Sequence, residues 1–139
     1  MAKKFLITRP RHDISTPYLH DFSKEIVKTI KETKEIHVTD LEDSKAIRIN
    51  VERCLAKENP GLVFLNGHGD KKRVAGHNDD IILDEKNIEF TKNKIVYALA
   101  CDSLDGLGPI AVRKGARAYI GYKASFMIVR DPYRESTPS

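Results

Sequence analysis

The chain has only two cysteines, Cys54 and Cys101, and they do not form a Cys-x-x-Cys pair. Two thiols are too few for the disulfide framework of a small secreted domain, so we expect both to be reduced. No set of cysteines and histidines has the close spacing of a zinc site, and we expect no metal or other cofactor. These absences favour a reducing compartment, and we expect the cytoplasm.

Long apolar runs are also missing, and none approaches the ~20 residues that cross a bilayer. The N-terminal sequence MAKKFLITRP lacks the apolar segment and cleavage site of a signal peptide. The first predicted strand is followed by PRHDISTP rather than by a glycine-rich or Ser/Thr-rich phosphate loop. We therefore expect neither a membrane partner nor a bound nucleotide or flavin.

The chain carries no strong excess of charge of one sign. Its 24 basic and 20 acidic residues give a net charge of +4 and are mostly interspersed. The clusters Lys71–Arg73 and Lys92–Lys94 are too short to form the concentrated basic face of a nucleic-acid-binding protein. The sequence therefore predicts no nucleic-acid partner.

Apolar residues alternate between strand-like and helix-like periods along most of the chain. Strands are predicted over Lys4–Arg9, Glu35–Leu41, Leu62–Gly67, Ile95–Ala100 and Arg117–Tyr122, and a small hairpin over Asp79–Phe90. Helices are predicted over Thr16–Thr33, around the apolar stripe from Ala46 to Leu55, and over Gly106–Lys114. This alternation predicts an α/β fold. We expect a three-layer α/β/α sandwich with flavodoxin-like layering and a mostly parallel sheet of about five main strands.

The length of 139 residues fits one domain. We expect this domain to span residues 1–130, with residues 131–139 as a flexible tail or the start of a linker. A short apolar segment, Ser125–Val129, precedes the tail and is a weak candidate for one more strand.

Two of the predicted strands end in residues that can carry chemistry. VFLNGHG (63–69) places His68 between two glycines, and IVYALACDS (95–103) places Cys101 directly after an apolar run. Neighbouring strands lie about 5 Å apart, and ligands of open parallel sheets bind beyond the carboxyl ends of the strands. If these two strands are neighbours, His68 and Cys101 face one crevice, which suits a thiol nucleophile assisted by an imidazole.

The glycines beside His68 fit the same chemistry. Gly67 and Gly69 permit sharp turns and the close approach of another segment. The backbone N–H groups of Gly69 and Cys101 are candidate donors to a developing oxyanion.

Each of these side chains also has a structural interpretation. Cys101 follows an apolar run, and this residue taken alone is better interpreted as a small buried hydrophobic group than as a nucleophile. His68 can simply bond a loop carbonyl at the strand end. His77 in AGHNDD is a candidate for substrate contact or for stabilising its own loop, but its sequence favours a solvated loop histidine. Cys54 lies on the apolar stripe of the second predicted helix, so we expect it in the core.

Two other cysteine chemistries do not fit the sequence. A phosphatase loop needs an arginine six residues after its cysteine, where this chain has Leu107. A class I glutaminase carries its cysteine in a Gly-x-Cys-x-Gly turn ahead of its histidine, and here the order is reversed.

From about Leu62 to Tyr122 the chain resembles the caspase-fold (clan CD) cysteine peptidases. The motifs are VFLNGHG, IVYALACDS and GPIAVRKGARAYIGY, and their form is closest to the CHAT and gingipain-like domains. The resemblance implies acyl transfer on a peptide or protein substrate, with Cys101 as nucleophile and His68 as general base. It also implies Gly69 and Cys101 as the oxyanion donors.

The resemblance is incomplete at the C-terminal side. The family core usually has six main strands, whereas this chain offers five and the segment Ser125–Val129. It therefore implies further domains or subunits that complete the fold, or a minimal form of it. Asp102 and Asp105 lie near the predicted nucleophile and could select a basic substrate residue, and Asp102 could instead cap the following helix.

Three classes of function remain open on the sequence alone. The first is a cysteine endopeptidase or its catalytic portion, and the second is a caspase-fold module that no longer cuts and serves regulation or assembly. The third is a flavodoxin-like binding domain for a small ligand, in which His68 and Cys101 meet by coincidence. Fold alone does not choose among them, because function depends on the site.

Overall fold

Five parallel strands form the central sheet of the computed structural model, which describes residues 3–11 and 16–123. Their order is β2-β1-β3-β7-β8, and every neighbouring pair is parallel. The strands are β1 (Lys3–Arg9), β2 (Ile36–Glu42), β3 (Leu62–Asn66), β7 (Ile95–Leu99) and β8 (Ala118–Ile120). The predicted α/β fold with a mostly parallel sheet is confirmed.

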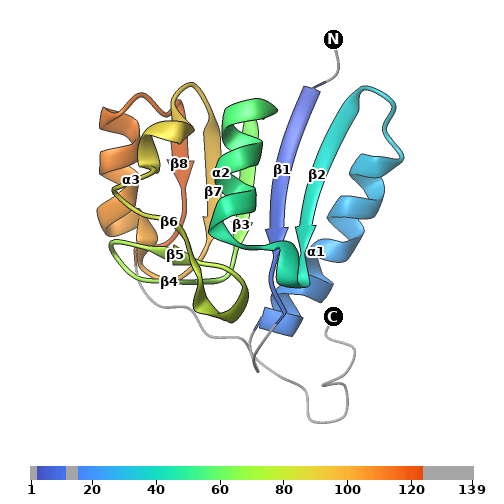
Figure 1. Ribbon diagram of the computed structural model, residues 1–139, viewed down its shortest axis with the longest axis horizontal. Coiled ribbons are helices and arrows are strands. Elements are labelled where there is room, and N and C mark those ends of the chain that lie inside the picture. Colours follow the sequence, from blue (N-terminus) through green and yellow to red (C-terminus); the bar gives the residue numbers. More distant parts are fainter. Residues whose placement is uncertain (1–2, 12–15, 124–139) are drawn as a thin grey trace.

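Alternate residues of each strand face opposite layers of helices. The helices are α1 (Thr16–Lys31), α2 (Arg48–Lys57) and α3 (Ser103–Arg113). Phe5 and Ile7 pack with Val27 of α1, whereas Leu6, between them in β1, belongs to the core on the α2 and α3 side. Figure 1 shows α2 and α3 together in front of the sheet. This period of two explains how one apolar strand serves two layers.

The chain order of the strands places the reversal of the sheet between β1 and β3. Strands β2 and β1 are added in one direction, and β3, β7 and β8 in the other. At such a point the connections leave neighbouring strands toward opposite faces, which opens a crevice at their carboxyl ends. The segment that carries His68 leaves β3 beside this point.

A second sheet of three very short antiparallel strands lies at the carboxyl ends of the large sheet (Figure 1). Its strands are β4 (His68–Gly69), β5 (Val74–Ala75) and β6 (Ile81–Leu83). The sequence predicts a hairpin over Asp79–Phe90, and the position of this hairpin is wrong. Only β6 lies in that range, and it pairs backward with β5.

Side-chain hydrogen bonds explain why the second half of the expected hairpin does not form. The carboxylate of Asp84 accepts a hydrogen bond from the Lys86 N–H at 2.9 Å, and the Asn87 amide donates to the Ile82 carbonyl at 3.0 Å. Such local bonds close a turn in place of a strand ladder. The chain then continues as a 3-10 helix, η3 (Ile88–Thr91).

Most predicted element boundaries agree with the structure within a few residues. Helix α2 begins at Arg48, so Ala46 precedes it, and α3 begins at Ser103 rather than Gly106. Cys54 is buried in the core as expected. The candidate strand Ser125–Val129 and the boundary at residue 130 lie outside the described residues. Within residues 3–11 and 16–123, no helix combines the length and apolar character needed to cross a membrane.

Arg48, the first residue of α2, binds the three-stranded sheet to that helix. Its guanidinium donates to both carboxylate oxygens of Asp84 at 3.0 Å and to the Ile81 carbonyl at 3.2 Å. Its backbone N–H, at the start of α2, donates to the Asp80 carboxylate at 2.7 Å. The hydrogen bond from Arg48 is the main cause that lowers the pKa of Asp84 below its ordinary 3.8.

We predict that Arg48→Met lowers the free energy of unfolding by about 1–2 kcal/mol at pH 7, because it removes a bidentate, charge-assisted contact with the Asp84 carboxylate. The folded pKa of Asp84 is depressed, so its contribution is complete above 3.8 and is lost as the pH falls through the folded value. Urea unfolding at pH 7 and pH 3 measures both effects. Arg53→Met, at an exposed position of α2, is the control. A loss of equal size at both pH values would contradict this account.

Candidate active site

The two predicted strand ends lie side by side in the sheet. Strands β3 and β7 are parallel neighbours, with Asn66 level with Leu99. The pairing extends one step further, because the Gly67 N–H donates to the Leu99 carbonyl at 3.3 Å. His68 and Cys101 each follow this level by the same number of residues, so the register brings the two segments to one edge.

Gly69 lies against the backbone of the Cys101 segment. A Cβ atom at Gly69 would be 2.8 Å from the Cys101 carbonyl oxygen and 2.8 Å from the Ala100 Cβ. Gly67 is equally restricted, since a Cβ there would be 2.0 Å from the Ala75 carbonyl oxygen. The glycines beside His68 therefore serve close backbone packing on two sides, as their positions in the sequence predict.

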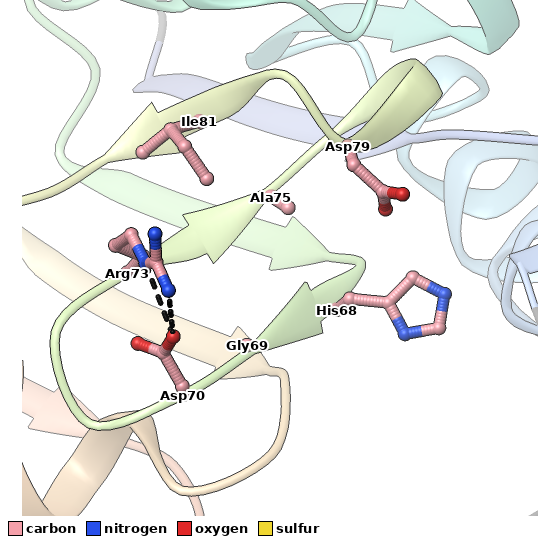
Figure 2. A pocket seen from close by; sticks show the side chains of 7 residues that line it. All are labelled: His68, Gly69, Asp70, Arg73, Ala75, Asp79 and Ile81. Carbon is pink, nitrogen blue, oxygen red and sulfur yellow. Dashed lines mark hydrogen bonds and ion pairs between the residues drawn. The ribbon is translucent and has the colours of Figure 1, made fainter.

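His68 borders a pocket of about 310 Å³ on the surface of the small sheet. Its lining residues are His68, Gly69, Asp70, Arg73, Ala75, Asp79 and Ile81. Figure 2 shows the imidazole at the start of β4, projecting away from the Asp70–Arg73 ion pair, with Asp79 on the neighbouring segment. The His68 side chain is partly buried, and Cys101 lies outside this lining.

Cys101 is held in a tight turn between β7 and α3. Asp102 has a left-handed backbone with φ of 60°, a conformation that Asp adopts more readily than most residues. Helix α3 begins at the next residue, Ser103. Cys101 is partly exposed and is not in a disulfide. Its thiol, which is not in a disulfide, is thus held at the junction of β7 and α3.

The first turn of α3 is tied to β8 and to the segment after it. The Tyr119 hydroxyl donates to the Ser103 Oγ at 3.0 Å, and the Leu104 N–H donates to the Tyr122 carbonyl at 3.1 Å. Burial raises the pKa of Tyr119 to about 12, so this hydroxyl keeps its proton under ordinary conditions. The turn that carries Cys101 is therefore anchored on its far side.

The three predicted substrate-binding residues occupy different surroundings. Asp102 stands at the N-cap position of α3, but its side chain makes no capping hydrogen bond. The Asp105 carboxylate is 3.3 Å from the Lys71 ammonium in an exposed ion pair. The Nδ1 of His77 is 3.5 Å from the Asp43 carboxylate. Asp105 and His77 are thus each engaged with a charged side chain of this chain.

Sequence reasoning missed the acidic and basic residues of the His68 pocket. Asp70 accepts hydrogen bonds from the Arg73 side chain at 2.7 and 3.0 Å, and this contact lowers the pKa of Asp70. Asp79 approaches from the segment before β6 with a left-handed backbone of φ 61°. The short spacing of Asp70 and Arg73 is the one signal that could have indicated their pairing.

The other cysteine, Cys54, has a contrasting environment. Its thiol lies in the core and donates to the Glu58 carboxylate at 3.3 Å. Burial first, and then this hydrogen bond, raise the pKa of Cys54 to about 12. The thiolate is the reactive form of cysteine, so Cys54 is protected from nucleophilic chemistry.

Among the residues that the structure describes, no three His, Cys, Asp or Glu side chains gather as a metal site would need. What the edge of the sheet offers is an imidazole and a thiol on adjacent, tightly packed segments. These are the components of nucleophilic catalysis by cysteine.

We predict that Gly69→Ala lowers the free energy of unfolding by about 1–3 kcal/mol, because backbone or Cβ atoms block the new methyl group on two sides. Gly61→Ala is the control, since a Cβ there would meet no atom within 4 Å. Urea unfolding of the two variants and the parent chain tests this. Equal stability of the two variants would show that β4 does not lie against the Cys101 segment.

No family model matches this chain, and neither a curated protein nor a solved structure matches it significantly. Its function is therefore inferred from its own residues and their geometry.

Proposed function

We propose that the chain is a caspase-fold cysteine endopeptidase, or the catalytic portion of one, with Cys101 as nucleophile and His68 as general base. The observation that supports it most is the close packing of Gly69 on the Ala100 Cβ and the Cys101 carbonyl oxygen. Together with the level pairing of Asn66 and Leu99, it holds the histidine and cysteine segments at one sheet edge. A catalytic dyad needs its histidine and cysteine segments side by side, whereas a cysteine that only packs in the core does not need a histidine segment beside it.

The proposed reaction is acyl transfer to sulfur followed by hydrolysis. His68 takes the proton of Cys101, and the thiolate forms a C–S bond to a peptide carbonyl carbon while its oxygen becomes negative. The C–N bond then breaks as the imidazolium gives its proton to the leaving amine. Water, deprotonated by His68, attacks the thioester, and the C–S bond breaks to restore the thiol and release a carboxylic acid.

Backbone N–H groups would stabilise the negative oxygen in this scheme. We assign that role to Gly69 and Cys101, the two residues that meet where the segments pack. Donors fixed before the reaction stabilise the developing charge without reorganising. Asp102, the acidic residue directly beside the nucleophile, is the candidate for contact with a substrate residue.

The proposal also specifies surroundings and partners. The substrate is a peptide or protein, and further domains or subunits complete the substrate pocket. A dyad thiol must stay reduced to act, and neither Cys54 nor Cys101 is in a disulfide, which favours the cytoplasm.

One observation favours a second candidate, a caspase-fold module that no longer cuts. The pocket beside His68 is lined by the small sheet and does not include Cys101. In such a module the same crevice would bind a partner without turnover. The reactivity of Cys101 separates the two candidates.

We predict that Cys101 reacts with iodoacetamide at pH 7 roughly tenfold faster than in the variant His68→Ala, because a neighbouring imidazole favours the thiolate. Both chains carry Cys54→Ala, and the rate is followed from pH 5 to pH 9 by mass spectrometry. His37→Ala, which removes an exposed histidine of β2, should leave the rate unchanged. A parent chain that reacts slowly and is indifferent to His68 would reject the dyad.

If the alkylation rate of Cys101 depends on His68, a peptide-library screen of the parent chain and Cys101→Ala follows. Cleavage that depends on Cys101 supports the peptidase. A coupled dyad without cleavage of any peptide favours the module that does not cut.

We also predict that iodoacetamide at pH 8 labels Cys101 in the folded chain and leaves Cys54 unlabelled. With its pKa raised to about 12, Cys54 keeps its proton at this pH. Digestion and mass spectrometry identify the labelled peptide, and the same reaction in urea should label both cysteines. Rapid labelling of Cys54 in the folded chain would contradict its described environment.

A further inference from the structure

The loop between β4 and β5, residues 70–73, contacts the helix that follows Cys101. The Lys71 carbonyl accepts a hydrogen bond from the Leu107 N–H of α3 at 2.9 Å. A Cβ atom at Gly106 would be only 1.9 Å from the same carbonyl oxygen. The loop therefore packs on the backbone of α3 at Gly106, where there is no side chain to keep it away.

The loop presents this carbonyl from a fixed turn. The Asp70 N–H donates to the Arg73 carbonyl at 3.0 Å, and the Asp70 carboxylate accepts from the Lys72 N–H at 2.8 Å. The Arg73 guanidinium adds bonds to the same carboxylate. The backbone of Lys71 lies inside this turn and is held by it.

The sequence of α3 fits this contact. The segment Gly106-Leu107-Gly108-Pro109 is a poor helix former, since glycine and proline disfavour helix interiors. Gly106 faces the loop, whereas Gly108 faces the Tyr119 ring and the Leu104 side chain. The two glycines therefore serve different contacts, one to the histidine-bearing hairpin and one to β8.

We propose that the docking of loop 70–73 on Gly106 sets the position of His68 relative to Cys101, so that Gly106 is a positioning residue of the dyad. The inference rests on the proposed function. The loop directly follows His68-Gly69, and α3 directly follows the Cys101 turn. A change in how the loop packs on α3 therefore also changes the position of His68 relative to Cys101. The exposed Lys71–Asp105 ion pair lies at the same contact and contributes little, because solvent screens it.

The test measures how much Cys101 reactivity depends on His68 when the contact is altered. All chains carry Cys54→Ala, and iodoacetamide rates are followed from pH 5 to pH 9. We compare the effect of His68→Ala in the parent chain, in Gly106→Ala and in Gly108→Ala. In the parent, loss of His68 should slow the reaction at pH 7 roughly tenfold.

Gly106→Ala should abolish most of this dependence, so that removing His68 as well changes the rate by less than about twofold. Gly108→Ala makes the same chemical change two positions away, where the new Cβ meets the ends of the Leu104 and Tyr119 side chains and not the loop. It should therefore preserve the tenfold effect. Both variants gain the same helix propensity, so a general effect on α3 would appear in both. Persistence of the His68 effect in Gly106→Ala would overturn the proposal.

A second pair of variants covers the case in which Gly106→Ala does not fold. Asp70→Ala removes the acceptor that fixes the loop turn, and it should reduce the dependence on His68. Asp70→Asn keeps an oxygen for the Lys72 N–H without the charge, and it should restore the dependence. Equal behaviour of Asp70→Ala and the parent would reject positioning by the loop.

The parent chain separates this proposal from the one on which it rests. If His68→Ala has no effect in the parent, the dyad itself fails, and positioning by Gly106 falls with it. If the parent shows the dyad and Gly106→Ala retains it, only the positioning role is rejected.

Discussion

The absence of a side chain at Gly69 is the constraint on which the site depends. Because Gly69 has no side chain, β4 lies against Ala100 and Cys101, and a Cβ atom at Gly69 would be only 2.8 Å from the Cys101 carbonyl oxygen. The parallel pairing of β3 with β7 brings the His68 and Cys101 segments to the same edge of the sheet, and the missing side chain of Gly69 lets their backbones pack closely. A histidine and a cysteine far apart in the sequence thus share one edge of the sheet.

The surroundings of this contact hold it from several directions. Tyr119 binds Ser103 on the β8 side of the Cys101 turn, and the Lys71 carbonyl binds the Leu107 N–H on the other. Arg48 ties the small sheet to α2 through Asp84 and the Ile81 carbonyl. The Tyr119–Ser103 bond is buried, and the Lys71–Leu107 bond joins backbone groups, whereas the Arg48–Asp84 pair is partly exposed. Buried and backbone hydrogen bonds keep their geometry better than exposed ion pairs do, so the two bonds nearest the candidate site hold it most firmly.

The two cysteines show how its surroundings decide whether a thiol can react or only packs in the core. Both follow or lie among apolar residues, and composition treats them alike. Cys54 is enclosed by the core and donates to Glu58, which raises its pKa to about 12. Cys101 stands in a turn at the end of a strand, partly exposed and next to a histidine segment. A thiol nucleophile needs access as well as a proton acceptor, and of the two cysteines only Cys101 is partly exposed.

The sequence by itself determined the layers of the fold and the two segments of the candidate site, because strand and helix periods, and His68 and Cys101 at strand ends, are local patterns. It misplaced the small hairpin, since the Asp84 and Asn87 side chains close a turn that apolar periodicity does not reveal. Only the tertiary structure decided what the glycines of α3 do. Gly106 meets the Lys71 carbonyl and Gly108 meets Tyr119, and these contacts join residues distant in the chain. Their partners are set by how the sheets pack, and no local pattern encodes that.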